Sequence, residues 1–300
     1  MNKLTMEAPA KINLGLDVLR RRPDGYHDLR MVMQTISLKD ELELTKTEEP
    51  GIFLTVESER EGELPADNKN LAYRAADLLL REFPQPGGVR IQLKKRIPIA
   101  AGLAGGSTDA AATLLGMNRL FDLGLSLSEL QKRGVTLGAD IPYCLMKGTA
   151  LAEGIGERLT RLPKAPACHV LLAKPDVPVS TAWVYQNLHL TEDTVHPDID
   201  EMMRCLAEGN LTKLCACLGN VLETVTIPAH PVIAQIKAQM KEAGALGALM
   251  SGSGPTVFGL FDSREKAEDC RRAIQEKNLA KELFVTEFEQ EECMGKDGTA

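Results

Sequence analysis

The most informative stretch of the sequence is Pro98-Ile-Ala-Ala-Gly-Leu-Ala-Gly-Gly-Ser-Thr-Asp109, because two kinds of regular structure meet in it. Apolar residues alternate from Val89 to Ile97 before it, and an apolar run from Ala110 to Phe121 follows it. This order predicts a strand that ends at Pro98, a loop of small residues and the beginning of a helix. Glycines let backbone N–H groups approach a ligand, and the first turn of a helix has unpaired N–H groups at the positive end of its dipole. The segment therefore favours an anion, although the glycines alone are equally typical of a tight turn packed against a neighbour.

Two hydroxyl groups strengthen the anion interpretation. Ser107 and Thr108 stand at the predicted beginning of the helix, where they can contact a phosphate or a magnesium ion. Together with the length of the loop, this pair favours a phosphate site. Several commoner catalytic motifs are absent from the sequence, which contains no G-x-x-x-x-G-K-[ST], no G-x-G-x-x-G after a strand, no H-E-x-x-H and no G-x-S-x-G.

A lysine and an asparagine stand two residues apart near the N-terminus. The stretch Ala8-Pro-Ala-Lys-Ile-Asn-Leu-Gly-Leu16 is typical of a strand, so Lys11 and Asn13 share one of its faces. A lone lysine is normally a solvated surface residue. Here Ala10 and Ile12 flank Lys11, which indicates a partly buried sheet.

A turn follows this strand. The stretch Arg20-Arg-Arg-Pro-Asp-Gly-Tyr-His27 contains the turn signal Pro-Asp-Gly. Tyr26 and His27 at its exit can stack on a flat ring or form hydrogen bonds with it. The three arginines fit either a solvated run of charges or contacts with a phosphorylated ligand.

Two segments on the C-terminal side carry further candidates. Asp140 lies in Gly138-Ala-Asp-Ile-Pro142, a frame that suits a helix cap as well as a reactive carboxylate. The second glycine-rich segment, Met250-Ser-Gly-Ser-Gly-Pro-Thr256, fits a hairpin-like turn when it is taken alone.

The remaining pattern contains strands and helices without regular βαβ alternation, which favours an α+β fold. Alternating or short apolar runs predict strands at residues 41–45, 52–57, 168–173, 256–261 and 282–288. Helical periodicity and capping residues predict helices at residues 71–83, 210–222, 230–243 and 264–277. The composition changes after Pro163, so we expect a domain boundary at residues 162–163.

The composition excludes several classes of protein. The 300 residues include 35 Lys and Arg against 42 Asp and Glu, and the net charge of −7 argues against non-specific nucleic-acid binding. Apolar runs are too short for a membrane helix and no signal peptide is visible, so we expect a cytoplasmic protein without a membrane partner. The seven cysteines are scattered, and their spacing fits neither a disulfide framework nor a zinc site.

Taken together, the motifs resemble those of the GHMP kinases. The resemblance rests on P-x-x-x-G-L-x-G-G-S-[ST] at Pro98–Thr108 and on S-G-S-G-P-T-V-F at Ser251–Phe258. Three other motifs resemble one branch of that family, whose substrate is a sugar alcohol linked to cytidine diphosphate: Pro9-Ala-Lys-Ile-Asn-Leu14, Pro23-Asp-Gly-Tyr-His27 and Gly138-Ala-Asp-Ile-Pro142. The similarity extends from residue 6 to about residue 288.

The resemblance implies a two-domain α+β fold with ATP and substrate in the cleft between the domains. A ribosomal-protein-like βα domain would span residues 1–162, a ferredoxin-like domain residues 163–288 and a flexible tail residues 289–300. The implied reaction is ATP-dependent phosphorylation of the 2-hydroxyl of the sugar alcohol, in the non-mevalonate route to isoprenoid precursors, with Mg²⁺ as the ion. The partners would be these small molecules, without nucleic acid, and the chain would be a monomer or a weak homodimer.

The resemblance also implies the catalytic and ATP-binding residues. Asp140 would be the base that takes the hydroxyl proton, and Lys11 would lie close to Asp140 and the reacting oxygen. Ser107 is the candidate metal ligand. The ATP phosphates would be surrounded by Pro98, Ile99, Ala100, Ala101, Gly102, Leu103, Ala104, Gly105, Gly106, Ser107 and Thr108. Many relatives have more glycines in this loop, and alanine resists the positive φ that glycine accepts.

The implied substrate contacts lie elsewhere in the chain. Asn13 would lie beside the substrate, Tyr26 and His27 would hold the cytosine, and Tyr185 would stack near the cytidine. Two alternatives stay open. In the first, the chain is another GHMP kinase of a small alcohol such as homoserine or mevalonate, and the Tyr-His pair argues against it. In the second, the chain is an ATP-binding regulator without kinase activity, and Lys11 and Asp140 argue against it.

Overall fold

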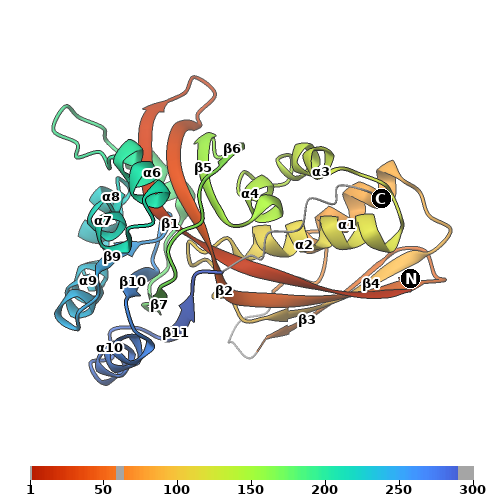
Figure 1. The fold of residues 1–300 in the computed structure, drawn as a ribbon. Helices are drawn as coiled ribbons and strands as arrows, with labels where there is room; N and C mark the ends of the chain where they lie inside the picture. The colour runs from red at the N-terminus through yellow and green to blue at the C-terminus, as the bar shows by residue number, and fades with distance from the viewer. Residues whose placement is uncertain (1, 59–63, 290–300) are drawn as a thin grey trace.

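The computed structural model describes residues 2–58 and 64–289, which form two β-sheets with helices packed against them (Figure 1). The first sheet has seven strands: β1 (Lys3–Arg21), β2 (His27–Thr47), β3 (Ile52–Ser58), β4 (Gly88–Lys95), β5 (Thr149–Gly154), β6 (Arg158–Arg161) and β8 (Gly219–Asn220). The second sheet has four strands: β7 (His169–Lys174), β9 (Gly247–Met250), β10 (Val257–Phe261) and β11 (Glu282–Glu287). Helices and sheets that do not alternate regularly confirm the predicted α+β class.

A long hairpin formed by β1 and β2 joins the two halves of the molecule. Its strands pair antiparallel from Lys3↔Thr45 to Arg21↔His27. One part of β2 pairs with β4 and the other part pairs with β5. Figure 1 shows the hairpin extending from the N-terminal end of the molecule to the opposite end. Three register shifts interrupt β1, and such bulges bend a strand and increase its twist.

Four helices belong to the first half of the chain: α1 (Leu71–Glu82), α2 (Gly105–Leu120), α3 (Leu127–Gly134) and α4 (Ile141–Met146). The predicted helix at residues 71–83 is confirmed, and the Asn70 side chain caps it by accepting the N–H of Ala72 at 2.9 Å. Helix α2 begins at Gly105, five residues before the apolar run that predicted it, because the last small residues of the loop are already helical. It packs against α1 and against β1 and β2, and most of its residues are buried.

The second half of the chain has a ferredoxin-like arrangement. Its sheet has the order β11-β7-β10-β9 and is antiparallel throughout. In chain order this is 4-1-3-2, the split βαβ pattern. The predicted strand at 168–173 and the predicted helix at 264–277 are confirmed, and Ser263 caps the latter. The helices of this half are α5 (Thr181–Gln186), α6 (Ile199–Ala207), α7 (Leu211–Ala216), α8 (Glu223–Ala229), α9 (Val232–Glu242) and α10 (Arg264–Glu276).

The predicted helix at residues 210–222 is wrong in its second half. Helix α7 ends at Ala216, and Gly219 and Asn220 then form β8, which pairs in parallel with β1. A Cβ on Gly219 would lie 2.8 Å from Cβ of Pro197, so only glycine fits this close approach. Helical periodicity could not detect it, because the strand pairing is decided by a partner far away in the sequence.

Two hydrophobic cores lie on opposite faces of the first sheet. One packs α1 and α2 against it, through residues such as Leu44, Ile91 and Leu114. The other joins Ile12 and Leu14 of β1 to the second sheet, where Phe258 is fully buried. Since successive side chains of a strand alternate, Lys11 and Asn13 point away from this second core.

The connection between the two sheets contains the predicted domain boundary. Strand β6 ends at Arg161 and β7 begins at His169. A division at residues 162–163 remains a prediction, since β8 returns to the first sheet from the second half. Of the predicted tail, Glu289 donates its N–H to the carbonyl of Thr35 at 3.0 Å, and residues 290–300 lie outside the described residues. Within the described part of the chain, every helix is too short or too polar to span a lipid bilayer.

Candidate active site

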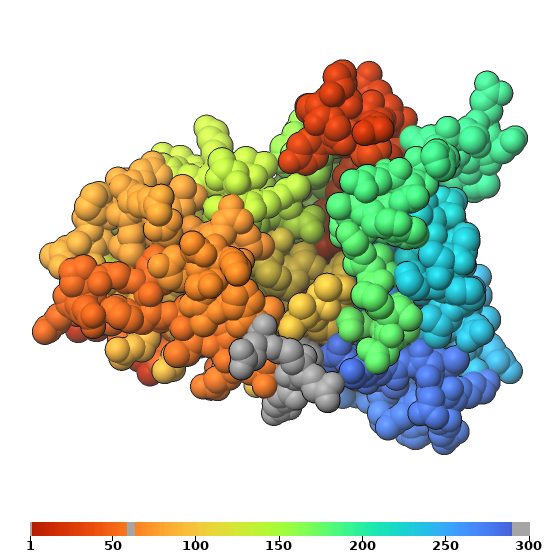
Figure 2. Space-filling view, turned by 180° about the vertical axis from the view of Figure 1, so that it is seen from behind, coloured from red at the N-terminus to blue at the C-terminus, as the bar shows by residue number. Residues whose placement is uncertain are grey.

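A cavity of about 790 Å³ lies where the two halves of the chain meet. Its walls come from the β1–β2 hairpin, from residues 98–107, from the beginning of α4, from α5 and from residues 252–253. We call residues 98–104 the first glycine-rich loop and residues 250–256 the second glycine-rich loop. Figure 2 shows the hollow between the orange segments of the first half and the green segment that includes α5.

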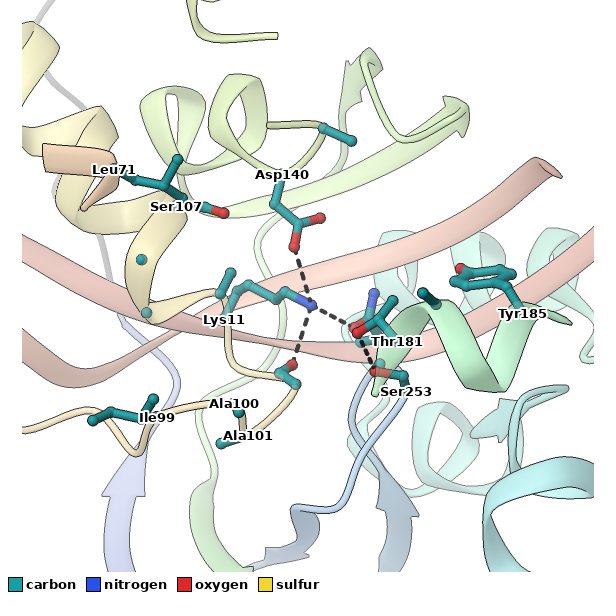
Figure 3. A pocket seen from close by; sticks show the side chains of 18 of the residues that line it. Lys11, Leu71, Ile99, Ala100, Ala101, Ser107, Asp140, Thr181, Tyr185 and Ser253 are labelled. Carbon is teal, nitrogen blue, oxygen red and sulfur yellow. Dashed lines mark hydrogen bonds and ion pairs between the residues drawn. The ribbon is translucent and has the colours of Figure 1, made fainter. Parts of the chain in front are cut away.

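Lys11 occupies the centre of the polar part of this cavity. Its side chain is almost fully buried, at 6% exposed, and its Nζ donates to Asn13 Oδ1 at 2.8 Å and to the carbonyl of Gly102 at 3.2 Å. The same Nζ lies 3.9 Å from Asp140 Oδ2. Figure 3 shows the lysine reaching between Asp140 and the first glycine-rich loop. The structure thus brings together Lys11, Gly102 and Asp140, which the sequence singled out in three separate segments.

Asp140 stands at the N-cap position of α4, yet its side chain does not cap the helix. The carboxylate is 36% exposed and faces the cavity, with the ammonium group of Lys11 beside it. The capping interpretation of the sequence is therefore wrong for this side chain. A carboxylate that is held next to a cation and open to a cavity can accept a proton from a bound alcohol.

The first glycine-rich loop has an unusual backbone. Gly102 has φ 73°, and Ala100 and Ala104 also have positive φ values, 50° and 57°. The alanines therefore adopt the left-handed conformation that their side chains disfavour. The loop leads into α2, whose first N–H groups are not used inside the helix and lie at the positive end of its dipole.

Of residues 98–108, which the sequence predicted to surround the ATP phosphates, all but two line the cavity. The lining includes Pro98, Ile99, Ala100, Ala101, Gly102, Ala104, Gly105, Gly106 and Ser107. Leu103 and Thr108 are buried, each 1% exposed, and are not part of the cavity wall. The hydroxyl of Thr108 donates to the carbonyl of Pro9 at 2.8 Å, which ties α2 to β1. Of the two predicted hydroxyls, Ser107 and Thr108, that of Ser107 lies at the cavity.

The second glycine-rich loop packs directly on the first. Ser251 Oγ donates to the carbonyl of Gly102 at 2.9 Å, and a Cβ on Gly102 would lie only 2.1 Å from the carbonyl oxygen of Ser251. Asn220 fixes the second loop, since its Nδ2 donates to the carbonyls of Met250 and Gly252, at 2.8 Å each. Asn220 is not among the predicted site residues, because it lies in the part of residues 210–222 that was wrongly predicted as a helix.

Aromatic side chains line the other end of the cavity. The rings of His27 and Tyr185 lie 5.1 Å apart, and Tyr26 is 59% exposed at the tip of the hairpin. Burial, and next the charge of Arg21, lower the pKa of His27 below its ordinary value of 6.5. Burial raises the pKa of the Tyr185 hydroxyl, so both rings are neutral at neutral pH. This end can hold a flat, uncharged ring.

The arginines before the turn are not equivalent. Arg20 donates to Asp28 at 2.6 Å, and Arg22 donates to Asp24 at 3.1 Å. Arg21 lines the cavity and lies close enough to His27 to lower its pKa. The charge run is therefore partly a set of surface ion pairs and partly a positive wall of the cavity.

Two hydroxyls that the sequence analysis did not single out also reach the cavity. Thr181 Oγ1 and Ser253 Oγ lie 2.8 Å apart, and both residues line the cavity (Figure 3). Ser253 belongs to a segment that the sequence did mark, whereas nothing around Thr181 distinguishes it from a helix-capping residue. In the part of the chain that the structure describes, no group of three or more His, Cys, Asp or Glu residues could hold a metal ion.

Comparisons with known proteins agree with this geometry. Residues 70–148 match the family described as "GHMP kinases N terminal domain", and residues 192–280 match "GHMP kinases C terminal". The 4-diphosphocytidyl-2-C-methyl-D-erythritol kinase of Lachnospira eligens is 50% identical over 96% of this chain and 99% of its own length. The enzyme of the same name from Geobacter sulfurreducens is 54% identical over 89% of this chain and 93% of its own length.

Solved structures give the same picture. A crystal structure of 4-(cytidine 5'-diphospho)-2C-methyl-D-erythritol kinase has a TM-score of 0.81 and 35% identity, and covers 96% of this chain and 100% of its own. The mevalonate kinase of L. major, solved with R-mevalonate, has a TM-score of 0.78 at 16% identity, covers 95% of this chain and 96% of its own, and so shares the fold alone.

Proposed function

The chain belongs to the GHMP kinase family, and we propose that it transfers the terminal phosphoryl group of ATP to the 2-hydroxyl of 4-diphosphocytidyl-2-C-methyl-D-erythritol. The observation that carries the proposal is one continuous cavity with two chemically different ends. Lys11, Asp140 and a glycine-rich loop lie at one end, and a neutral aromatic pair lies at the other. Such a cavity suits a substrate in which a reactive alcohol is joined to a nucleobase through a diphosphate.

Asp140 acts as the general base in this proposal. The substrate hydroxyl oxygen attacks the terminal phosphorus of ATP, the bond from that phosphorus to the oxygen of ADP breaks, and the hydroxyl proton passes to the carboxylate. Positioning and electrostatic stabilisation dominate phosphoryl transfer, and a general base typically adds about 10²–10⁴ in rate. The exposed carboxylate, 3.9 Å from Lys11, supports this role.

Lys11 orients the reacting groups. Its Nζ is already held by Asn13 and by the Gly102 carbonyl, so the charge has a fixed position before substrate binds. A fixed cation beside Asp140 stabilises charge on the phosphoryl group as it transfers. Asn13, on the same face of β1, lies beside the substrate in this arrangement.

The first glycine-rich loop and the start of α2 bind the phosphates of ATP. N–H groups at a helix N-terminus together with its dipole favour a phosphate there. Mg²⁺ is usually held by the nucleotide phosphates and water with few protein ligands, and the Ser107 hydroxyl at the cavity fits that need. The ion would neutralise charge on the phosphates.

Tyr26, His27 and Tyr185 bind the cytosine. A neutral His27 can donate one hydrogen bond and accept another, which matches the edge of a nucleobase. Relatives that are about half identical along nearly the whole chain carry the name of this kinase, which supports the same substrate and the same place in isoprenoid-precursor synthesis. A location in the cytoplasm and a monomeric or weakly dimeric state remain predictions.

A substrate panel tests the proposal. Purified protein with ATP and Mg²⁺ is assayed for ADP release with the cytidyl alcohol, with free methylerythritol, with homoserine and with mevalonate. We expect turnover with the cytidyl alcohol at least about 100-fold above the others, because the aromatic end contributes binding only when the nucleobase is present. Equal or faster turnover of homoserine or mevalonate would point to another alcohol kinase, and ATP binding without turnover of any alcohol would point to a regulator.

A further inference from the structure

Three ionisable side chains that the proposed mechanism does not use form a buried cluster beside the beginning of α2. Asp40, Lys95 and Asp109 are 0%, 7% and 3% exposed. Lys95 Nζ donates to both carboxylates, to Asp109 Oδ2 at 2.7 Å and to Asp40 Oδ2. The ammonium group also lies 3.3 Å from the point where a Cβ on Gly105 would stand. The cluster therefore sits at the end of the first glycine-rich loop.

The same cluster also holds the beginning of that loop. The second oxygen of Asp40 accepts the N–H groups of Arg96 and Ile97, at 2.5 Å and 2.8 Å. These two residues come directly before Pro98, where the loop begins. The Asp40 carboxylate on β2 thus holds the beginning of the loop directly. It holds the end of the loop through Lys95 of β4, which in turn binds Asp109 of α2.

The loop between these two ends is strained. Ala100 and Ala104 have positive φ, a conformation that L-residues disfavour because Cβ comes too close to the backbone. Such conformations persist only when the surrounding structure enforces them. Fixing both ends of a seven-residue loop to one buried carboxylate provides such enforcement.

We infer that Asp40, Lys95 and Asp109 are positioning residues that hold the first glycine-rich loop in the shape that binds the ATP phosphates. We call these three residues the loop clamp. The inference rests on the proposed function only in taking ATP as the ligand of this loop. Lys95 and Asp109 also line the cavity. Lys95 already donates two of its three N–H groups to carboxylates, and Asp109 Oδ2 already accepts one of them, so both residues act on the loop through the cluster.

Asp109 offers the cleanest substitutions. Burial raises the pKa of Asp109 to about 8, against the opposing effect of Lys95, so asparagine matches its neutral form in size and charge. Asp109→Asn keeps an oxygen that can accept from Lys95. Asp109→Leu keeps the branched shape of the side chain, with two methyl groups in place of the oxygens, and has no acceptor. The two variants therefore separate the tie between loop and helix from the space that the side chain fills.

The test measures two dissociation constants at equilibrium. The Kd of a non-hydrolysable ATP analogue with Mg²⁺ and the Kd of cytidine diphosphate are determined by calorimetry, together with the melting temperature. We expect Asp109→Leu to raise the Kd of the ATP analogue by at least about 10-fold, since a hydrogen bond to a charged group is lost. Asp109→Asn should stay within about threefold of the parent, and the Kd of cytidine diphosphate should stay within about twofold in both variants.

A matched control uses an ion pair away from the cavity. Lys174 Nζ lies 3.2 Å from Glu282 Oε1 between β7 and β11, and both side chains are 16% exposed. Lys174→Met should lower the melting temperature without changing either Kd. If Asp109→Leu does not fold, Asp40→Asn replaces it, because it weakens the hold on both loop ends with no change in volume.

Two results would overturn the loop clamp. One is a folded Asp109→Leu or Asp40→Asn variant whose Kd for the ATP analogue stays within about twofold of the parent. The other is an equal rise of both dissociation constants, which would indicate a general structural effect. If cytidine diphosphate does not bind the parent protein, the proposed substrate fails, and the Kd of the ATP analogue against the melting temperature still decides the clamp.

Discussion

Removing the charges of Lys11 and Asp140, one at a time and together, tests the proposed chemistry most directly. The variants are Lys11→Met, Asp140→Asn and the double substitution. The lysine ammonium group and the aspartate carboxylate are 3.9 Å apart. If they act as a unit on the reacting hydroxyl, removing the second charge should cost less once the first is gone.

The expected coupling follows from that distance. Coulomb's law gives about 4 kcal/mol for unit charges at this separation with an effective dielectric constant of about 20, and about 1 kcal/mol in water. Since the Asp140 side chain is 36% exposed, solvent screens part of the interaction. We therefore expect a coupling of about 1–2 kcal/mol, roughly 5–30-fold in kcat.

The assay is ADP release at saturating ATP and cytidyl alcohol. Asp140→Asn should lose at least about 10² in kcat while it still binds ATP, because it loses a general base. Lys11→Met should reduce kcat more than ATP affinity. The kcat of the double variant should exceed, by the coupling factor, the kcat expected if the two single losses simply multiplied.

Another lysine–carboxylate pair provides the control. Lys94 Nζ lies 3.7 Å from Glu41 Oε1 on the sheet, and the lysine side chain is 52% exposed. Lys94→Met should leave kcat unchanged. Near-normal turnover of Asp140→Asn would reject the base assignment, and losses that multiply without coupling would separate Lys11 from Asp140.

Three further predictions concern the cavity and the core. Burial and Arg21 lower the pKa of His27, so KM for the cytidyl alcohol should rise as the pH falls through a value below 6.5. Arg21→Gln should move the midpoint of this pH profile to higher pH, whereas Arg20→Gln should not, and equal midpoints in the two variants would contradict the assignment. Gly102→Ala places a Cβ 2.1 Å from a carbonyl oxygen at φ 73°, so it should weaken ATP binding and lower the free energy of unfolding by more than about 1 kcal/mol, and unchanged binding in calorimetry would be the opposite result. Phe258→Ala removes a fully buried ring and should cost about 3–5 kcal/mol in urea denaturation, where a loss below about 1 kcal/mol would mean that the second core is repacked.

The local parts of the site could be predicted from the sequence. The spacing of Lys11 and Asn13 put them on one face of a strand, and the alternation of strand side chains makes that inference independent of the fold. The turn before Tyr26 and the cap at Ser263 likewise depend on neighbouring residues only. Short-range geometry of the backbone decides all of these features.

Other parts of the site could not be predicted, because they depend on contacts between distant segments. The spacing around Asp140 favoured a helix cap, and only the fold turned its carboxylate towards Lys11. Asn220 was predicted to lie in a helix, but it pairs with β1 and belongs to a strand. Local periodicity contains no information about which distant strand will pair.

In the first glycine-rich loop, some features follow from the local sequence and others depend on tertiary contacts. The sequence determined that small residues connect a strand to a helix, because only such residues permit a tight turn and a close ligand. It could not determine that two alanines take positive φ, which alanine disfavours. The tertiary structure decided this, since buried Asp40, a residue of another strand, holds the chain on both sides of the loop, directly and through Lys95, and outweighs the local preference of the backbone.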